Sequence, residues 1–348
     1  MAYKRAQSRY NMMKLTLIST LICLLLASLL VFTQSTSLRP AIQKLVNSIA
    51  KTNVVMGSAV GEAGSRPAQW DEYINLTKAA TSKELIELTD NASGVVRCYA
   101  FQALANRKDK NIFNILLSHL NDTARIETLF GCTGGTIMVG DYFVDVVTPG
   151  LVDPESQKRD DAEKSVLDSI LLFDKHINLV AKSQVLNKLS PLKKFYQRVR
   201  EITVSENTPE AILALAKYKN KNDVSIIARF LKDESLQFWG IQAAREFPDK
   251  TFYPELVQVF ENEWNKEKYD YPLWRVLYQA LAKYPEEKTS ELFDRTIQST
   301  DVFRRNTLGV YLLVALNRYP DTEFASIKSR IKLAEPYLEE YSFEMERD

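Results

Sequence analysis

The sequence predicts an all-α fold, an α-solenoid of stacked helical hairpins, on three observations. Apolar residues recur at offsets 0, 3, 4, 7, 8 and 11 along residues 236–247, 273–284 and 308–319, so each segment fits one face of an α-helix. These stripes start 37 and 35 residues apart, which is the near-regular spacing of a repeat array. The 348 residues include only 11 glycines, and a low glycine content favours helices.

The N-terminus carries a segment suited to a membrane. Residues 1–14 have four basic side chains and no acidic one, and residues 15–32, from Leu15 to Phe32, have no charge. At ~1.5 Å per residue a helix of this length spans about 27 Å, close to the ~30 Å core of a bilayer. The pattern predicts a single-pass membrane protein with a transmembrane signal-anchor, a cytoplasmic N-terminus and an exported, extracytoplasmic (for example periplasmic) body. The alternative is a signal peptide cleaved near Ser35 or Ser37, which would leave a secreted protein.

Residues 33–69 are interpreted as a linker to a body that begins near Trp70. In the linker, AIQKLVNSIAKT favours a short helix, and VVMGSAVGEAGSRPAQ favours irregular chain because it holds three glycines and a proline. Residues 70–130 predict the N-terminal repeats. Ser82 is the expected N-cap of one helix there, and residues 94–120 favour a helix, a polar turn at 106–111 and a return helix.

A Gly-rich insert and connector, residues 131–161, interrupts the repeats. Five of the 11 glycines lie between residues 131 and 150. The sequences TIMV and YFVDVV stand on either side of Gly140 and Asp141 and have strand-like composition. They predict a hairpin or an ordered loop.

Residues 162–348 predict the C-terminal repeats. Residues 168–189 and 192–202 favour one weak helix pair, and four clearer hairpins follow. Equivalent positions in their first helices hold alanine: Ala214, Ala243, Ala280 and Ala315. Small residues such as Gly240 would let paired helices approach closely. The acidic end EPYLEEYSFEMERD favours a solvated cap on the last hairpin.

Five strings at the first-helix ends carry a resemblance to a known superfamily: YAFQALANRKDK, AILALAKYKNKND, GIQAAREFPDK, LYQALAKYPEEK and LLVALNRYPDTE. The chain resembles HEAT-repeat and HEAT-like proteins over residues 81–122 and 162–333. The resemblance implies a curved helical stack used for protein binding or scaffolding. The repeat steps are shorter and less even than the usual ~40 residues, so TPR-like hairpins remain an alternative.

The sequence holds few groups that could carry catalysis. It has two histidines, His119 and His176, and no His/Cys spacing of a zinc site, no phosphate-binding loop and no nucleophile elbow. His119 lies on an apolar stripe and is expected to be a packed side chain. We therefore expect no metal and no cofactor. The formal net charge of +1 gives no reason to expect a nucleic-acid partner.

Two segments supply candidate site residues. The insert holds Cys132, Asp141, Tyr142 and Asp145, and loops that interrupt repeats often line the working face; the alternative is a packed insertion whose glycines serve turns. Cys132 lies 34 residues after Cys98, about one repeat, so a disulfide between them is possible in an exported protein, and two independent packed cysteines are the alternative.

The second segment is WNKEKYDYPLW, in which Trp264, Tyr271 and Trp274 surround a polar loop. Such side chains can anchor a peptide or a glycan, or they can simply be buried between helices. The sequence thus favours a non-enzymatic protein–protein interaction or scaffold module tethered to a membrane. The alternatives are a HEAT-like enzyme, for example of lyase type, that uses Cys132 and Asp141, and a purely structural envelope component.

Overall fold

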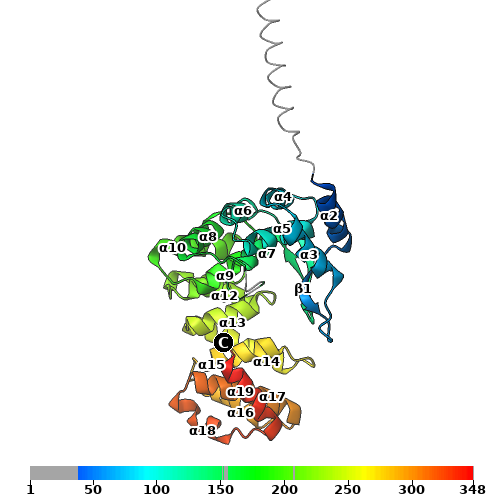
Figure 1. The fold of residues 1–348 in the computed structure, drawn as a ribbon. Helices are drawn as coiled ribbons and strands as arrows, with labels where there is room; N and C mark the ends of the chain where they lie inside the picture. Colours follow the sequence, from blue (N-terminus) through cyan, green and yellow to red (C-terminus); the bar gives the residue numbers. More distant parts are fainter. Residues whose placement is uncertain (1–37, 151, 153–155, 207, 348) are drawn as a thin grey trace, which may run out of the picture. The chain divides into compact units, whose positions relative to one another are not determined.

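The chain forms two compact units, residues 1–158 and 159–348, and helices predominate among the described residues (Figure 1). The computed structural model describes residues 38–150, 152, 156–206 and 208–347. The expected membrane or signal segment, residues 15–32, lies outside these residues. Within the described part of the chain, every helix is too short or too polar to cross a bilayer.

The first unit surrounds one buried helix. Its helices are α2 (Pro40–Thr52), α3 (Ala68–Ala79), α4 (Ser82–Leu88), α5 (Gly94–Asn106), α6 (Ile112–Ser118) and α7 (Val139–Val146). Each of the other five helices described in this unit contacts α5, and ten residues of α5 are buried. Helices α2, α5 and α6 agree with the predicted segments. The N-cap of α4 is Thr81 rather than Ser82, because Thr81 and Glu84 form a reciprocal capping box.

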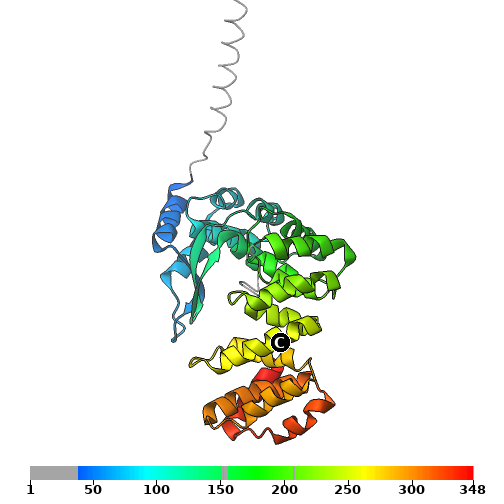
Figure 2. The same cartoon turned by 180° about the vertical axis from the view of Figure 1, so that it is seen from behind.

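A small sheet also belongs to this unit, so the prediction of an all-α fold holds for most of the chain but not here. The sheet has the order β1 (Val54–Val60), β2 (Arg125–Gly131) and β3 (Thr133–Met138). Strand β1 runs parallel to β2, and β2 runs antiparallel to β3 (Figure 2). The base of the sheet lies close to α5, since a Cβ on Gly94 would stand 2.7 Å from Ile126 Cγ2.

The sheet corrects two predictions. The stretch expected to be irregular linker, VVMGSAV, is strand β1, and the phenol of Tyr99 accepts a hydrogen bond from the Met56 amide at 2.8 Å. The hairpin turns at Gly131 and Cys132, not at Gly140 and Asp141. The first residue of a two-residue hairpin turn needs a positive φ, and Gly131 adopts a φ of +56°.

The expected strand YFVDVV is instead part of helix α7. Its composition favours a strand, but Val139, Phe143 and Val146 follow helical spacing and are all buried. The ring of Phe143 stacks on Phe101 of α5 with 3.9 Å between centroids. Packing against α5 therefore overrides the local strand preference.

The second unit is a succession of short helices. They are α8 (Asp161–Phe173), α9 (Ala181–Lys188), α10 (Lys193–Ser205), α11 (Ala211–Ala216), α12 (Val224–Lys232), α13 (Gln237–Glu246), α14 (Tyr253–Trp264), α15 (Tyr271–Leu281), α16 (Glu287–Ile297), α17 (Val302–Arg318), α18 (Ala325–Arg330) and α19 (Glu335–Glu346). Helices α11, α13, α15, α17 and α19 contact one another in that order, and α14 contacts α12 just as α18 contacts α16. The unit thus has two rows of helices.

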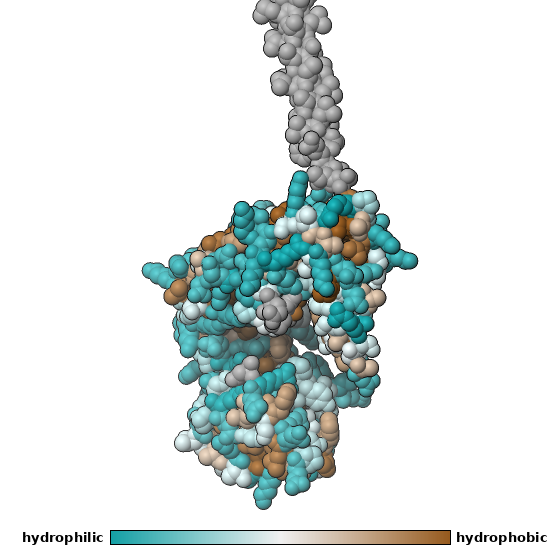
Figure 3. Space-filling model, viewed as in Figure 1, coloured by the Kyte–Doolittle hydropathy of each residue, from teal (hydrophilic) through white to brown (hydrophobic). Residues whose placement is uncertain are grey.

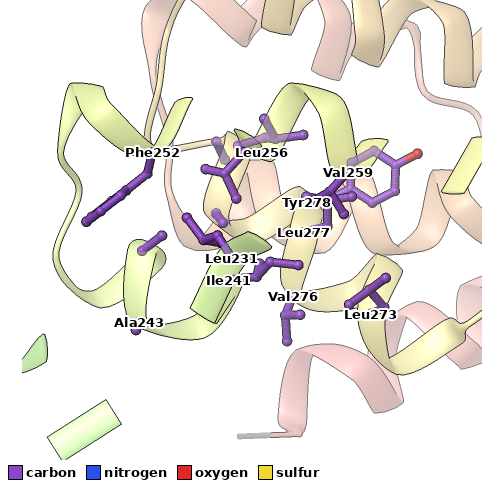
Figure 4. Close-up of a cluster of buried hydrophobic side chains, with 14 of the residues drawn as sticks. Leu231, Ile241, Ala243, Phe252, Leu256, Val259, Leu273, Val276, Leu277 and Tyr278 are labelled. Atoms are coloured by element: carbon purple, nitrogen blue, oxygen red, sulfur yellow. The ribbon is translucent and has the colours of Figure 1, made fainter. Parts of the chain in front are cut away.

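One hydrophobic core runs through these rows from Leu172 to Ile327. Figure 4 shows part of it, where side chains of consecutive helices such as Ile241, Leu256 and Leu277 meet. The predicted close approach of small residues occurs at Gly240, where a Cβ would stand 2.7 Å from the backbone nitrogen of Leu231 in α12. The stripe residues therefore form the core, as the sequence predicted.

One prediction for this unit is wrong in detail, and another, the solvated cap at the C-terminus, holds except at one residue. Residues 168–189 form parts of two helices, because α8 ends at Phe173 and the Leu172 carbonyl accepts a hydrogen bond from Arg198 Nε at 2.6 Å. The acidic C-terminal segment is helix α19, which packs on α17. Its Glu344 is not solvated but buried against Arg275, with Arg275 Nε 2.5 Å from Glu344 Oε2.

Candidate functional site

The candidate residues of the insert do not converge. Cys132 is exposed in the turn of the hairpin, whereas Asp141 is buried in the first turn of α7. Tyr142 is buried and donates a hydrogen bond to Gln102 Oε1 at 2.8 Å, and Asp145 is half-buried on the same helix. The six residues of β3 separate the thiol from α7, a distance of about 20 Å along a strand.

The two cysteines outside the N-terminal segment are both free, so the possible disulfide is not formed. Cys98 is fully buried in α5, and burial raises the pKa of its thiol. Cys132 lies at the exposed tip of the hairpin. One repeat of sequence separation does not bring them together, because β2 carries the chain out of the helical layer before Cys132.

His119 is packed, as its position on an apolar stripe predicted. Its ring lies 5.0 Å from that of Phe143, with Nε2 3.6 Å from Asp90 Oδ1 and Nδ1 3.9 Å from Asp122 Oδ2. Asp122 also forms an ion pair with Arg97 at 2.8 Å. Burial lowers the pKa of His119, which favours the neutral ring. Among the residues that the structure describes, no group of His, Cys, Asp and Glu could hold a metal ion.

The aromatic segment behaves differently, because it builds a surface. Trp264 ends α14, Tyr269 lies in the following loop, and Tyr271 begins α15. Phe303 and Arg304, at the start of α17, lie against them. We call these five residues the aromatic–arginine patch.

Tyr269 lies at the centre of the aromatic–arginine patch. Its ring stands 6.1 Å from that of Tyr271 and 6.0 Å from that of Phe303. Its hydroxyl accepts a hydrogen bond from Arg304 Nε at 2.8 Å and donates one to Asp301 Oδ2 at 3.3 Å. These bonds fix the loop between α14 and α15 onto α17.

The guanidinium of Arg304 contacts two of the rings. It lies 4.6 Å from the ring centroid of Trp264 and 5.2 Å from that of Tyr269, within the range of cation–π attraction. Asp301 caps α17 by accepting a hydrogen bond from the Arg304 amide at 3.0 Å, and this bond lowers the pKa of the Asp301 carboxyl. The patch is therefore held in place by contacts within the chain.

Trp274 has a structural role and does not reach the surface. It is fully buried, and its ring lies 6.2 Å from Trp264 and 5.0 Å from Phe260. Of the three candidates in this segment, Trp264 and Tyr271 belong to the patch and Trp274 is the core residue beneath it.

The upper surface of the patch is apolar and open. Tyr271 is 36% exposed, Phe303 is 49% exposed, and its neighbour Val302 is 57% exposed. Figure 3 shows hydrophobic residues gathered in small areas between hydrophilic ones on this unit. Exposed aromatic side chains held by arginine are the residue types that dominate binding energy at protein interfaces.

The sequence motif contained Tyr269, but sequence reasoning missed Phe303 and Arg304. A usable signal was present, since Arg304 lies 35 residues after Tyr269 and so occupies the start of the next repeat. Equivalent ends of neighbouring repeats lie side by side in a stacked array. No protein-family model matches this chain, and no curated protein sequence does.

Proposed function

We propose that this protein is a non-catalytic interaction module, held at a membrane by residues 15–32, that binds a partner protein through the aromatic–arginine patch. The single observation that carries the proposal is a pair of exposed rings, Tyr271 and Phe303, on either side of the half-buried Tyr269, whose ring and hydroxyl Arg304 contacts. An apolar segment of a partner would place side chains between the rings of Tyr271 and Phe303. The formal net charge of +1 favours a protein partner over a nucleic acid.

The second unit is the binding scaffold in this proposal. The two rows of helices and their 35- to 37-residue stripe spacing support a HEAT-like α-solenoid. In such an array each hairpin contacts only its neighbours, so residues at the same end of successive hairpins form one continuous surface. The aromatic–arginine patch lies at one such set of ends, those of α15 and α17.

The membrane part of the proposal rests on the sequence of residues 15–32. Four basic residues before that segment favour a cytoplasmic N-terminus and an exported body. Cell fractionation, combined with N-terminal sequencing or mass of the mature protein, tests the membrane anchor. A full-length protein in the integral membrane fraction supports the anchor. A soluble exported protein that has lost residues 1–37 shows the signal-peptide alternative instead.

We do not extend the proposal to catalysis. The alternative enzyme would use Cys132 together with Asp141, but Cys132 lies in an exposed turn and Asp141 is buried in helix α7. A phenotype lost in Cys132→Ala but kept in Phe303→Ala would favour that alternative.

The binding claim is tested by co-purification from solubilised membranes. The double variant Tyr271→Ala with Phe303→Ala should lose a defined partner, because it removes both open rings. Phe173→Ala is a matched control, since Phe173 is 48% exposed in the same unit but lies on α8. If the control loses the partner to the same extent as the double variant, the patch is not the binding surface.

A further inference from the structure

The outer edge of strand β3 is an open hydrogen-bonding surface. Strand β3 is the last strand of the sheet, and within the described residues no backbone hydrogen bond reaches its outer side. Residues 133–136 are exposed. Unpaired strand edges pair readily with another strand, so natural proteins usually protect them with charges, prolines or a covering element.

Strand β3 carries none of those protections. Its sequence is TGGTIM, which has no charged residue and no proline. Gly134 and Gly135 have no side chains, so no side chain at these positions hinders a second strand that approaches the edge. The edge is therefore suited to pairing rather than defended against it.

The opposite edge of the same sheet, strand β1, is covered in part. The amide of Val60 donates to the Ser65 carbonyl at 2.8 Å, and the amide of Ser65 donates back to Val60 at 2.9 Å. Helix α3 also contacts β1. Strand β3 is therefore the more open edge, which favours a closed dimer over a fibre of edge-to-edge copies.

We propose that two copies of this chain pair through their β3 edges, antiparallel and about a two-fold axis at Gly135, to form one six-stranded sheet. In a two-fold interface each residue of the strand lies near the same residue, or a close neighbour, in the second copy. A charged strand would therefore repel its copy, so the strand at such an interface should be uncharged. Strand β3 has no charged residue. The inference is independent of the aromatic–arginine patch, which lies in the other unit.

The hairpin register fixes which groups pair. Phe130 and Thr133 flank the two-residue turn and exchange hydrogen bonds, so alternation directs the backbone groups of Gly135 toward β2. Those of Gly134 and Thr136 then face outward. With the axis at Gly135, Gly134 of one copy bonds Thr136 of the other. The two Gly135 residues form a non-hydrogen-bonded pair, whose ~4.5 Å Cα spacing glycine accommodates.

A cysteine at the axis tests this arrangement in the full-length chain in membranes, with Cys23→Ser and Cys132→Ser as background. Gly135→Cys should form a covalent dimer under mild oxidation, because the two thiols face each other. A Cβ at this position lies 3.7 Å from Thr128 Oγ1, an ordinary contact, so the hairpin tolerates the change. Ala59→Cys, exposed on β1, is the control and should remain monomeric.

Two further variants act on the outer edge and keep the backbone hydrogen bonds between β2 and β3; Thr136→Lys removes one side-chain bond of the hairpin, from Thr136 Oγ1 to Glu127 Oε1. In the Gly135→Cys background, Gly134→Pro removes an outward amide from each copy and should lower the dimer fraction about tenfold, the loss expected for two backbone hydrogen bonds. Thr136→Lys should lower it as well by placing two charges at the interface. The proposal is overturned if Gly135→Cys gives no dimer, if Ala59→Cys gives as much, or if neither edge variant reduces the yield.

Discussion

Replacing Gly240 by alanine should destabilise the protein, although the same change in most helices stabilises it. Helix propensity alone would favour alanine by about 1 kcal/mol. A Cβ at position 240, however, would stand 2.7 Å from both Leu231 N and Phe230 C in α12. These are backbone atoms, so no change of rotamer relieves the clash and α12 must shift.

The size of the effect follows from these two terms. Overpacking a close contact costs about 1–3 kcal/mol, and a backbone obstacle belongs at the upper end of that range. After the propensity gain, Gly240→Ala should lower the free energy of unfolding by about 2 kcal/mol. With a urea m-value of roughly 2 kcal/mol/M, the unfolding midpoint should fall by about 1 M.

Gly309 in α17 provides the control. It is also a buried mid-helix glycine, but its Cβ would meet only Leu333 Cδ2 at 3.7 Å, an ordinary contact. Gly309→Ala should therefore raise the unfolding free energy by about 1 kcal/mol. Urea unfolding followed by tryptophan fluorescence measures both variants. If Gly240→Ala raises the midpoint as Gly309→Ala does, the close packing of α12 and α13 is refuted.

Three further predictions concern single side chains. Because burial lowers the pKa of His119 below its ordinary 6.5, the unfolded state binds that proton more readily. The unfolding free energy should then fall as pH drops below 6.5, and His119→Asn should flatten this dependence in urea titrations at several pH values. In the Cys23→Ser protein, a thiol reagent should label Cys132 in the native state and Cys98 only after unfolding. If neither cysteine is labelled in the native protein, a disulfide between them is indicated. Glu344→Ala leaves Arg275 half-buried without its partner and should cost about 3 kcal/mol. Hydrogen exchange should show faster amide exchange in α19, and unchanged rates there would contradict the role of this pair.

The apolar stripes predicted most helices of the second unit, because each stripe marks the one helix face that must be buried. The stripe from Leu273 to Tyr284 and the small residue Gly240 both lie where the pattern places them, in the core and at a close helix contact. Helix ends were less predictable. The break after Phe173 depends on Arg198, 25 residues later, binding a carbonyl near the helix end.

The first unit was less predictable because its sheet joins distant segments. Strand β1 has the composition of a linker and pairs with β2 across about 70 residues, from Val54 to Glu127. Helix α7 has the composition of a strand, and contact with α5 decides its conformation. The candidate site shows the same limit: Tyr271 was visible in a local motif, whereas Arg304 joins the site only because α17 packs against α15.

Site-specific photocrosslinking tests the binding function of the aromatic–arginine patch most directly. A photoreactive phenylalanine analogue replaces Tyr271 in one protein and Phe173 in the other, and both are irradiated in intact membranes. We expect one discrete adduct from position 271 that disappears when Phe303→Ala is added, and no such adduct from position 173. The same adducts from both positions, or none from position 271, would contradict the account.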